Sequence, residues 1–247
     1  MKKTSLKKML IITYAAIALI VAAVVSGVAI YYIRSSTDMA YSNYEDAMNQ
    51  GYNTEIKSEV QSSIAVIEYY YNRFKAGELT EEQAKTEAKE AVRKMRYRDD
   101  NSGYMWIDAS DYSLVMHPIL PQNEGQNRYT LQDQNGVMII QEIMKTANNG
   151  GGYNQFYFTK ADGVTVALKV AYSQKFEPWG WIVTTGNYVD DMEAEMSEVK
   201  GQIRDNFSSM VMMILIIAVI LLIVAIIISY IESENIIVKP LKQIQQM

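Results

Sequence analysis

Two long runs without a charged residue bracket most of this 247-residue chain. The first extends from Met9 to Ile33 and the second from Ser208 to Ile231. Because a helix rises 1.5 Å per residue, about 20 apolar residues cross a bilayer core of about 30 Å. We therefore expect membrane helices at 10–33 and 208–231. The remaining parts are a cytoplasmic N-terminus (1–9), a folded domain (34–207) and a short tail (232–247).

A cleaved signal peptide is the alternative explanation for the first run. Its apolar stretch is longer than the roughly 7–15 residues of a signal-peptide core, and Ser26–Ala29 is a weak cleavage site. Four lysines precede the run (Lys2, Lys3, Lys7 and Lys8). By the positive-inside rule they predict a cytoplasmic N-terminus, which puts the domain outside the cell (inner) membrane.

The charge of the domain at 34–207 limits its partners. It carries 17 basic and 26 acidic residues, a net charge of −9. This balance argues against nucleic acid, which binds basic surfaces. The chain contains no cysteine, so the domain depends on its own hydrophobic core rather than on disulfides. At about 174 residues it is large enough to build one.

The first part of the domain has the pattern of a long helix. Ile56, Val60, Ile64 and Ile67 follow one another at helical spacing and form one apolar stripe. We expect the first membrane helix to continue outward to about Phe74. A single stripe on such a rod packs either against its own domain or against a second copy of the chain, which predicts a homodimer.

The remainder of the domain alternates helices and strands. A capping box at 80–83 predicts a second helix to about Met95. Expected strands cover 104–108 and 114–117 as a hairpin, then 153–159, 164–172 and 181–185. A further helix is expected at about 136–147, and an exit helix from Val189. The predicted fold class is α+β, with an antiparallel sheet between two membrane helices.

Catalytic and metal chemistry find little support in the sequence. With one histidine and no cysteine, transition-metal ligands are scarce. The acidic clusters at 99–101 and 133–136 lack the spacing of a calcium loop and are typical of turns. Nucleophile motifs and phosphate-binding glycine loops are absent. We expect neither an enzyme nor a cofactor.

Binding of a small polar molecule is better supported. The hairpin at 104–117 carries Tyr104, Trp106 and the single histidine, His117. Lys169 interrupts an apolar strand, where it is either solvated or a buried cation that attracts a carboxylate. Arg96 and Arg98 have the same two interpretations. Tyr104, Trp106, Tyr157 and Trp181 are equally well explained as core aromatics.

Five segments of the chain resemble the single Cache sensor domain of bacterial methyl-accepting chemotaxis receptors. They are GYMWID (103–108), HP (117–118), KVAY (169–172), WGWIVTTGNYVDD (179–191) and GELTEEQA (77–84), and the resemblance covers roughly 34–191. The segment 235–242 resembles the opening of a HAMP linker. The resemblance implies a PAS-like antiparallel sheet packed on a long N-terminal helix, with an enclosed pocket. Members often bind small organic acids such as acetate, propionate, pyruvate or lactate.

The resemblance also implies a set of ligand-binding residues. They are Tyr104, Trp106, His117, Tyr157, Lys169 and Tyr172, with Arg96 and Arg98 just before the motif. Two positions depart from the family pattern: Thr184 stands where glycine is common, and Asn187 where an apolar residue is common. Both lie where the last strand meets the exit helix, and they bear on signal coupling rather than on the ligand.

The expected function is that of a chemoreceptor fragment that senses a short-chain carboxylate and passes the signal through the second membrane helix to HAMP. Its further partners are chemotaxis signalling proteins, reached through a cytoplasmic part not contained in this sequence. One alternative is the sensor part of a histidine kinase or nucleotide cyclase. A second alternative is a ligand-free structural module for dimerisation.

Overall fold

A computed structural model of the chain describes residues 6–235 and 239–240 and separates into two compact units. The helical unit comprises 1–44 and 198–247, and the sheet unit comprises 45–197. Helices α1 (Leu6–Lys75) and α4 (Val189–Ser233) each contribute to both units. Most of the segment that resembles a HAMP opening lies outside the described residues.

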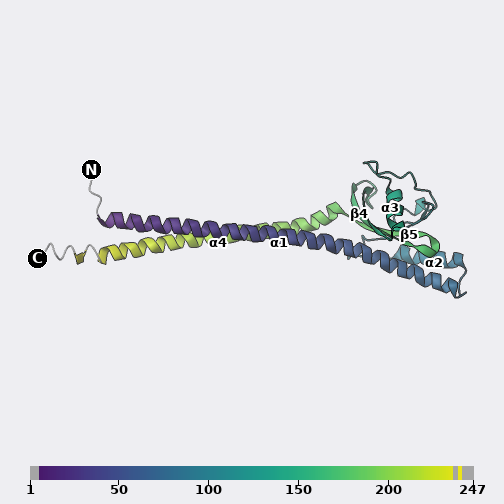
Figure 1. Cartoon of the computed structure of the whole chain (residues 1–247), viewed down its shortest axis with the longest axis horizontal. Helices are drawn as coiled ribbons and strands as arrows, with labels where there is room; N and C mark the ends of the chain where they lie inside the picture. The colour runs from purple at the N-terminus through teal and green to yellow at the C-terminus, as the bar shows by residue number, and fades with distance from the viewer. Residues whose placement is uncertain (1–5, 236–238, 241–247) are drawn as a thin grey trace. The chain divides into compact units, whose positions relative to one another are not determined.

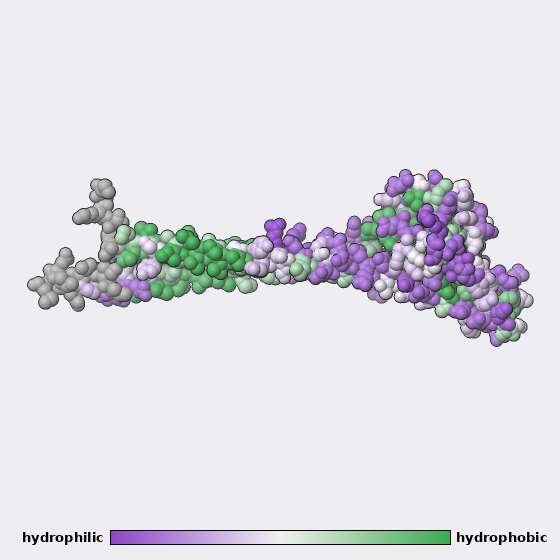
Figure 2. Space-filling view, viewed as in Figure 1, coloured by the Kyte–Doolittle hydropathy of each residue, from purple (hydrophilic) through white to green (hydrophobic). Residues whose placement is uncertain are grey.

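The helical unit contains the two predicted membrane segments. Both α1 and α4 are long and apolar enough to cross a membrane. Their large apolar side chains are mostly exposed rather than packed inside the protein, as for Ile20 and Leu221. Figure 2 shows the hydrophobic residues of this unit gathered along the two helices. Exposure on this scale is unfavourable in water and favourable in lipid.

The sheet unit is built on five antiparallel strands in the order β2–β1–β5–β4–β3. Figure 1 shows helices on both sides of this sheet. The strands are β1 (Trp106–Ala109), β2 (Leu114–Met116), β3 (Gly152–Thr159), β4 (Val166–Phe176) and β5 (Trp181–Tyr188). The helices are α2 (Glu81–Lys94), α3 (Ile139–Asn148) and two short 3-10 turns, η1 (Pro121–Asn123) and η2 (Glu177–Trp179). The predicted α+β class is confirmed.

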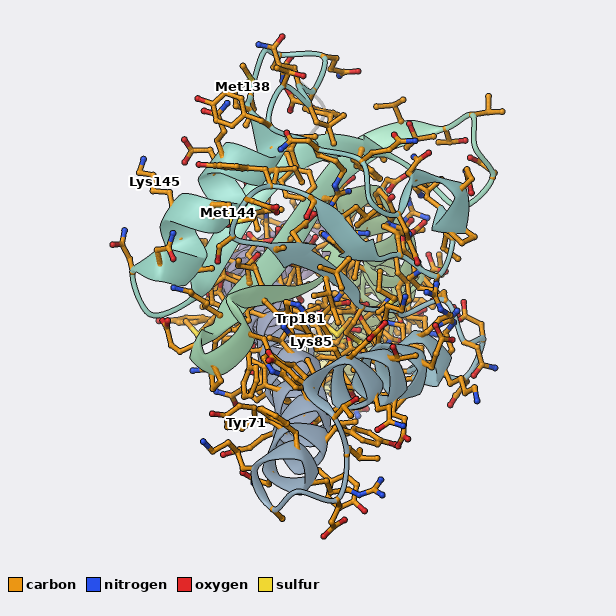
Figure 3. The ribbon with its side chains drawn as sticks, turned by 90° about the vertical axis from the view of Figure 1, so that its right-hand side faces the viewer. Tyr71, Lys85, Met138, Met144, Lys145 and Trp181 are labelled. Carbon is orange, nitrogen blue, oxygen red and sulfur yellow. The ribbon has the colours of Figure 1, made fainter. Side chains whose placement is uncertain are left out.

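One face of the sheet packs on the Glu45–Lys75 part of α1 and on α2. The predicted apolar stripe of α1 lies here, and Ile56, Val60 and Ile67 are fully buried. Met105 and Ile107 oppose them from the hairpin. The capping box is also confirmed, because the Thr80 hydroxyl accepts from Gln83 N and the Gln83 side chain accepts from Thr80 N. In Figure 3, Trp181 of the sheet lies next to Lys85 of α2, and both border a surface groove.

The other face packs on α3. Its apolar positions Ile139, Ile140, Ile143 and Met144 are buried against the sheet. Lys145, the residue after Met144, points away from the sheet in Figure 3 and is largely exposed. One turn of helix thus carries both a buried and a solvated side chain, as the helical period requires.

The helix predicted to begin at about 136 begins at Ile139, three residues later. The Asp133 side chain accepts from Asn135 N and Val137 N, and Gly136 has a positive φ of 81°. These contacts form a turn that occupies the residues expected to open the helix.

Two glycines allow close approach of neighbouring groups. A Cβ on Gly103 would lie 2.4 Å from the Tyr97 ring, and one on Gly186 would lie 2.4 Å from Val170 O. Gly103 opens the segment leading into β1, and Gly186 lies within β5. Larger residues there would push apart the elements that frame the site described next.

Candidate functional site

A small closed cavity lies between the sheet and α3. Its volume is about 10 Å³, enough for about one water molecule. The site is small and tightly packed. Its lining combines apolar, aromatic and cationic side chains: Tyr104, Trp106, His117, Arg128, Ile139, Ile140, Phe156, Phe158 and Lys169.

Strand register brings the lining residues together. Lys169 of β4 is opposite Phe156 of β3 and Tyr188 of β5. Because side chains alternate along a strand, Phe156 and Phe158 share the cavity face with Lys169. On the neighbouring side, β1 pairs with β5 through Trp106 and Thr184. The β5 strand therefore lies between the two strands that carry the site.

Lys169 is the principal charge in the cavity. The residue is 2% exposed, and its ammonium lies 4.9 Å from the Tyr104 ring, 5.0 Å from the Trp106 ring and 4.6 Å from the Tyr188 ring. Within the described part of the chain it makes no ion pair or hydrogen bond. Burial lowers the pKa of Lys169 to about 7. A buried ammonium with aromatic contacts and no anion is suited to an anionic ligand.

His117 lines the same cavity. Its Nδ1 accepts from Ile119 N at 3.2 Å and from Leu120 N at 3.1 Å. Burial lowers the pKa of His117 to about 3, with a further contribution from neighbouring cations that include Arg128 and Lys169. The imidazole is therefore neutral, and its proton is on Nε2. The His117 ring stacks on Trp106 with 6.0 Å between ring centres.

Arg128 was not predicted as a site residue. Its Nε donates to Asp108 Oδ1 at 3.1 Å, and its terminal nitrogen donates to the same oxygen. Burial raises the pKa of Asp108, and the Arg128 guanidinium opposes that rise. Sequence periodicity gives no indication of this pair, because Arg128 lies in the loop between β2 and α3. The available signal was Asp108 itself, since a carboxylate on a buried strand face requires a cation.

Two polar atoms beside the cavity lack a partner of ordinary geometry. They are Trp106 Nε1 and Asp108 Oδ2, both buried. The indole N–H nevertheless lies close enough to the carboxylate to favour its ionised form. The indole N–H and the carboxylate are therefore neighbours rather than two independent unsatisfied groups.

Tyr157 and Tyr172, both predicted as ligand contacts, do not line this cavity. Tyr157 alternates with Phe156 and Phe158, so it points away from Lys169, and its backbone N donates to Asp133 Oδ2. Tyr172 belongs to the core against α1, and its ring meets Tyr153 at 4.9 Å. Strand alternation separates both from Lys169.

Arg96 and Arg98 also lie elsewhere. Arg96 is exposed and donates to the carbonyls of Arg93 and Met95. Arg98 forms an ion pair with Glu55 of α1, with contacts of 2.8 and 3.3 Å. Burial tends to lower the pKa of Arg98, but Glu55 raises it above the usual value. Arg98 lines a separate, larger cleft of about 270 Å³ that Tyr104 and Lys169 also border.

The two departures from the family pattern are both buried and hydrogen-bonded. Thr184 Oγ1 donates to Ser173 Oγ at 3.1 Å. Asn187 Nδ2 donates to Glu55 Oε2 at 3.1 Å, the carboxylate that also holds Arg98. The end of β5 is therefore tied to α1 by polar contacts. No group of three or more metal-ligating side chains occurs among the residues described.

Residues 48–202 match the family model for the Single Cache domain 2, which covers more than half of the chain. The chain belongs to this family. The predicted resemblance to a single Cache sensor is confirmed, and the match ends at residue 202, before the segment at 235–242.

Similar proteins include a methyl-accepting chemotaxis protein and a sensor histidine kinase. The chemotaxis protein McpP of Pseudomonas putida is 33% identical over 147 residues, covering 59% of this chain and 26% of McpP. The sensor histidine kinase MctS of Rhizobium johnstonii is 27% identical over 171 residues, covering 69% of this chain and 36% of MctS. The chain thus spans well under half the length of these two relatives. It is a chemoreceptor-type Cache sensor with candidate membrane helices at both ends.

A solved Cache chemosensory domain has the same fold. It is 28% identical with a TM-score of 0.55, and the match covers 58% of this chain and 97% of that domain. Its structure is described as the structural basis for carboxylic acid recognition. The shared fold confirms the predicted arrangement of helices and antiparallel sheet.

Proposed function

We propose that this Cache domain is the sensory part of a membrane chemoreceptor and that its ligand is a short carboxylate. The observation that carries the proposal is the ammonium of Lys169, which is buried among aromatic rings without an anion. An isolated buried charge is costly, and a bound carboxylate would remove that cost. The carboxylic acid recognition described for the solved relative supports the same ligand class.

The charges around the cavity favour a monoanion. Asp108 and Arg128 form a pair with no net charge, and His117 is neutral, so Lys169 leaves one positive charge. A monocarboxylate neutralises that charge, whereas a dicarboxylate would leave a buried negative charge. The volume of about 10 Å³ also favours a small ligand, and the cavity must expand to admit one. His117 Nε2 and Trp106 Nε1 supply donors for the carboxylate oxygens.

Transmission would proceed through β5. This strand pairs with β1 on one side and β4 on the other, and it continues directly into α4 at Val189. A ligand that draws Lys169 and Trp106 together therefore acts on both neighbours of β5. A shift of about 1–2 Å there would pass along α4, as in other receptors that move helices. The ligand biases signalling by its difference in affinity for the two states.

The proposed topology has a cytoplasmic N-terminus, two membrane helices and an extracytoplasmic Cache domain. The lysines before the first span support this orientation. Two copies side by side would bury the exposed apolar surface of α1 and α4 within a parallel bundle. The output would be a chemotaxis signalling domain, as in McpP. MctS supports histidine kinase output as the second candidate.

A thermal-shift assay on the full chain in detergent tests the proposal. The panel contains acetate, propionate, lactate and pyruvate, with succinate, amino acids and amines as comparison compounds. A ligand at 100 times its dissociation constant should stabilise the protein by about 2.7 kcal/mol, a shift of a few degrees. We expect monocarboxylates to produce it and Lys169→Met to abolish it.

Lys175→Met is the matched control, because Lys175 lies on the same strand but is paired with Glu177 at 2.8 Å. Equal shifts in wild type and Lys169→Met would remove Lys169 from the mechanism. Shifts with amines or uncharged compounds alone would keep the sensor and overturn the carboxylate. No shift across the whole panel would favour the ligand-free structural module.

A further inference from the structure

Lys169 borders two hollows rather than one. It lines the closed cavity of about 10 Å³ and also a cleft of about 270 Å³. Tyr104 also lines both hollows. The cleft reaches the surface, since Ser102, Ala161 and Asp162 on its lining are exposed. These side chains therefore form a partition between solvent and the proposed binding site.

The partition consists of side chains that can rotate. The Lys169 ammonium lies between the rings of Tyr104 at 4.9 Å and Tyr188 at 4.6 Å. A lysine side chain has a flexible four-carbon stem. Three of the remaining wall residues are core, since Ile139, Ile140 and Phe156 are each at most 2% exposed, whereas Phe158 and Arg128 are half-buried. Passage between the three core residues would require α3 or β3 to separate from the sheet, whereas the partition opens by rotation of side chains.

The turn between β3 and β4 forms the outer wall of the cleft. It is a compact turn, in which the Asp162 carboxylate accepts from Val164 N and Thr165 N at 2.9 Å each. Lys160 N donates to Thr165 O at 2.8 Å and closes it. Such a turn moves as one piece, and the amplitude of its motion depends on the contacts between the turn and the rest of the domain.

A clasp made of Lys160, Asp190 and Asp191 holds this turn. Lys160 Nζ lies 2.8 Å from Asp190 Oδ2 and 2.7 Å from Asp191 Oδ1. Both carboxylates are in the first turn of α4. The Lys160 side chain is 18% exposed, and the carboxylate side chains are 50% and 57% exposed. Ion pairs with exposed partners contribute little to equilibrium stability, so the clasp is able to open and reclose.

We propose that the cleft is the entrance by which a carboxylate reaches Lys169, and that the Lys160–Asp190–Asp191 clasp controls how often this entrance opens. This inference rests on the proposed function. Its consequence is that ligand entry disturbs the first turn of α4, the helix through which the signal would leave. The clasp limits the rates of binding and release, whereas Lys169 determines the affinity.

Two variants act in opposite directions on the entrance. Lys160→Met removes the clasp, and we expect the association and dissociation rate constants to rise together by at least about threefold, with the dissociation constant changed less than twofold. Ala161→Trp places a bulky ring on an exposed position at the cleft, and both rate constants should fall. Lys175→Met is the control. Like Lys160→Met it removes a lysine–carboxylate contact, but Lys175 lies on β4 and does not line the cleft.

Stopped-flow fluorescence on the full chain in detergent measures these rates, with Trp106 in the cavity as reporter. The probes are acetate, propionate, lactate and pyruvate, and the rates are compared for each compound that binds the wild type. Rates in Lys160→Met and Ala161→Trp that match those of Lys175→Met would overturn the entrance while leaving the carboxylate site intact. Failure of all four compounds to bind the wild type would overturn the proposed function and the entrance with it.

Discussion

The two faces of the sheet are built on different principles. The face against α1 and α2 is an apolar core in which Ile56, Val60, Met105 and Ile107 are fully or almost fully buried. The face against α3 encloses Lys169 among aromatic rings without an anion. The first arrangement stabilises the fold, and the second lowers stability in order to present unsatisfied groups to a ligand.

This difference has a physical consequence for the sensor. Burial of apolar side chains in a core makes folding more favourable. An unpaired buried ammonium makes folding less favourable, and a bound carboxylate offsets that cost, so it makes binding more favourable. Changes on the α1 face should therefore affect stability, and changes on the α3 face should affect stability and binding in opposite directions. Substitutions on the two faces test that contrast.

The largest expected effect is on the α1 face. Ile107→Ala should lower the free energy of unfolding by about 2–5 kcal/mol, because it leaves a cavity in a fully buried position. Carboxylate affinity of the folded protein should stay within about threefold of wild type. Urea unfolding and calorimetric titration of the same preparation check both. Val115→Ala, at a half-buried position of β2, is the control with a smaller expected loss. Lost affinity with unchanged stability would contradict the division between the faces.

Substitution of Lys169 is expected to raise the free energy of unfolding rather than lower it. The pKa of Lys169 is about 7 in the folded chain against 10.5 without burial, so below pH 7 the fold carries the full cost of the buried charge. Lys169→Met should therefore raise stability by roughly 5 kcal/mol at pH 6. Between about pH 7 and 10.5 the unfolded chain binds more protons, and wild-type stability rises with pH relative to the variant. The gain in Lys169→Met should shrink accordingly.

Urea unfolding of both proteins at pH 6, 7.5 and 9 measures this change. The other ionisable groups that line the two hollows with Lys169, among them Tyr104, Tyr188 and His117, are present in both proteins. A stability difference that does not vary with pH would mean that Lys169 does not titrate in this range.

Carboxylate affinity should fall as pH rises. Binding needs the protonated ammonium, and half of the free protein has lost that proton at about pH 7. The dissociation constant should increase about tenfold between pH 6 and pH 8. His117 should not contribute, since its pKa of about 3 keeps it neutral throughout. Titrations at three pH values give the result, and a flat profile would exclude proton-linked binding at Lys169.

The smallest effect is expected at Asn187. Its side chain donates to Glu55, which keeps its ion pair with Arg98 when Asn187 is lost. Asn187→Leu should lower stability by about 0.5–1 kcal/mol, with carboxylate affinity within twofold of wild type. Unfolding and titration of this variant together check the prediction. A large loss of affinity would place Asn187 in the binding site instead of at the junction with α4.

The sequence predicted the elements of the fold because their patterns are local. The stripe at Ile56 and Val60, the capping box at Thr80 and the alternation around Trp106 each report a helix or strand directly. The boundary at α3 was wrong because a side-chain turn at Asp133 competes with the helix. Local polar contacts of this kind are weakly encoded in hydrophobic periodicity.

The candidate site was predicted in part for the same reason. Tyr104, Trp106, His117 and Lys169 do meet in one cavity. Tyr172 was separable from Lys169 by strand parity, since three residues apart on a strand means opposite faces. Arg128 was not predictable from periodicity, because its position depends on the path of the loop between β2 and α3. The ion pair of Arg98 with Glu55 depends likewise on tertiary packing.

The central claim is that Lys169 is buried without an anionic partner and binds a carboxylate in its protonated, ammonium form. The most direct test is calorimetric titration of the full chain at pH 8, with the carboxylate that gives the largest thermal shift, in buffers of different ionisation enthalpy. With a pKa of about 7, Lys169 is mostly neutral in the free protein at that pH. We predict uptake of close to one proton per ligand bound in the wild type, and the same uptake in Lys175→Met. Binding without proton uptake would contradict the account.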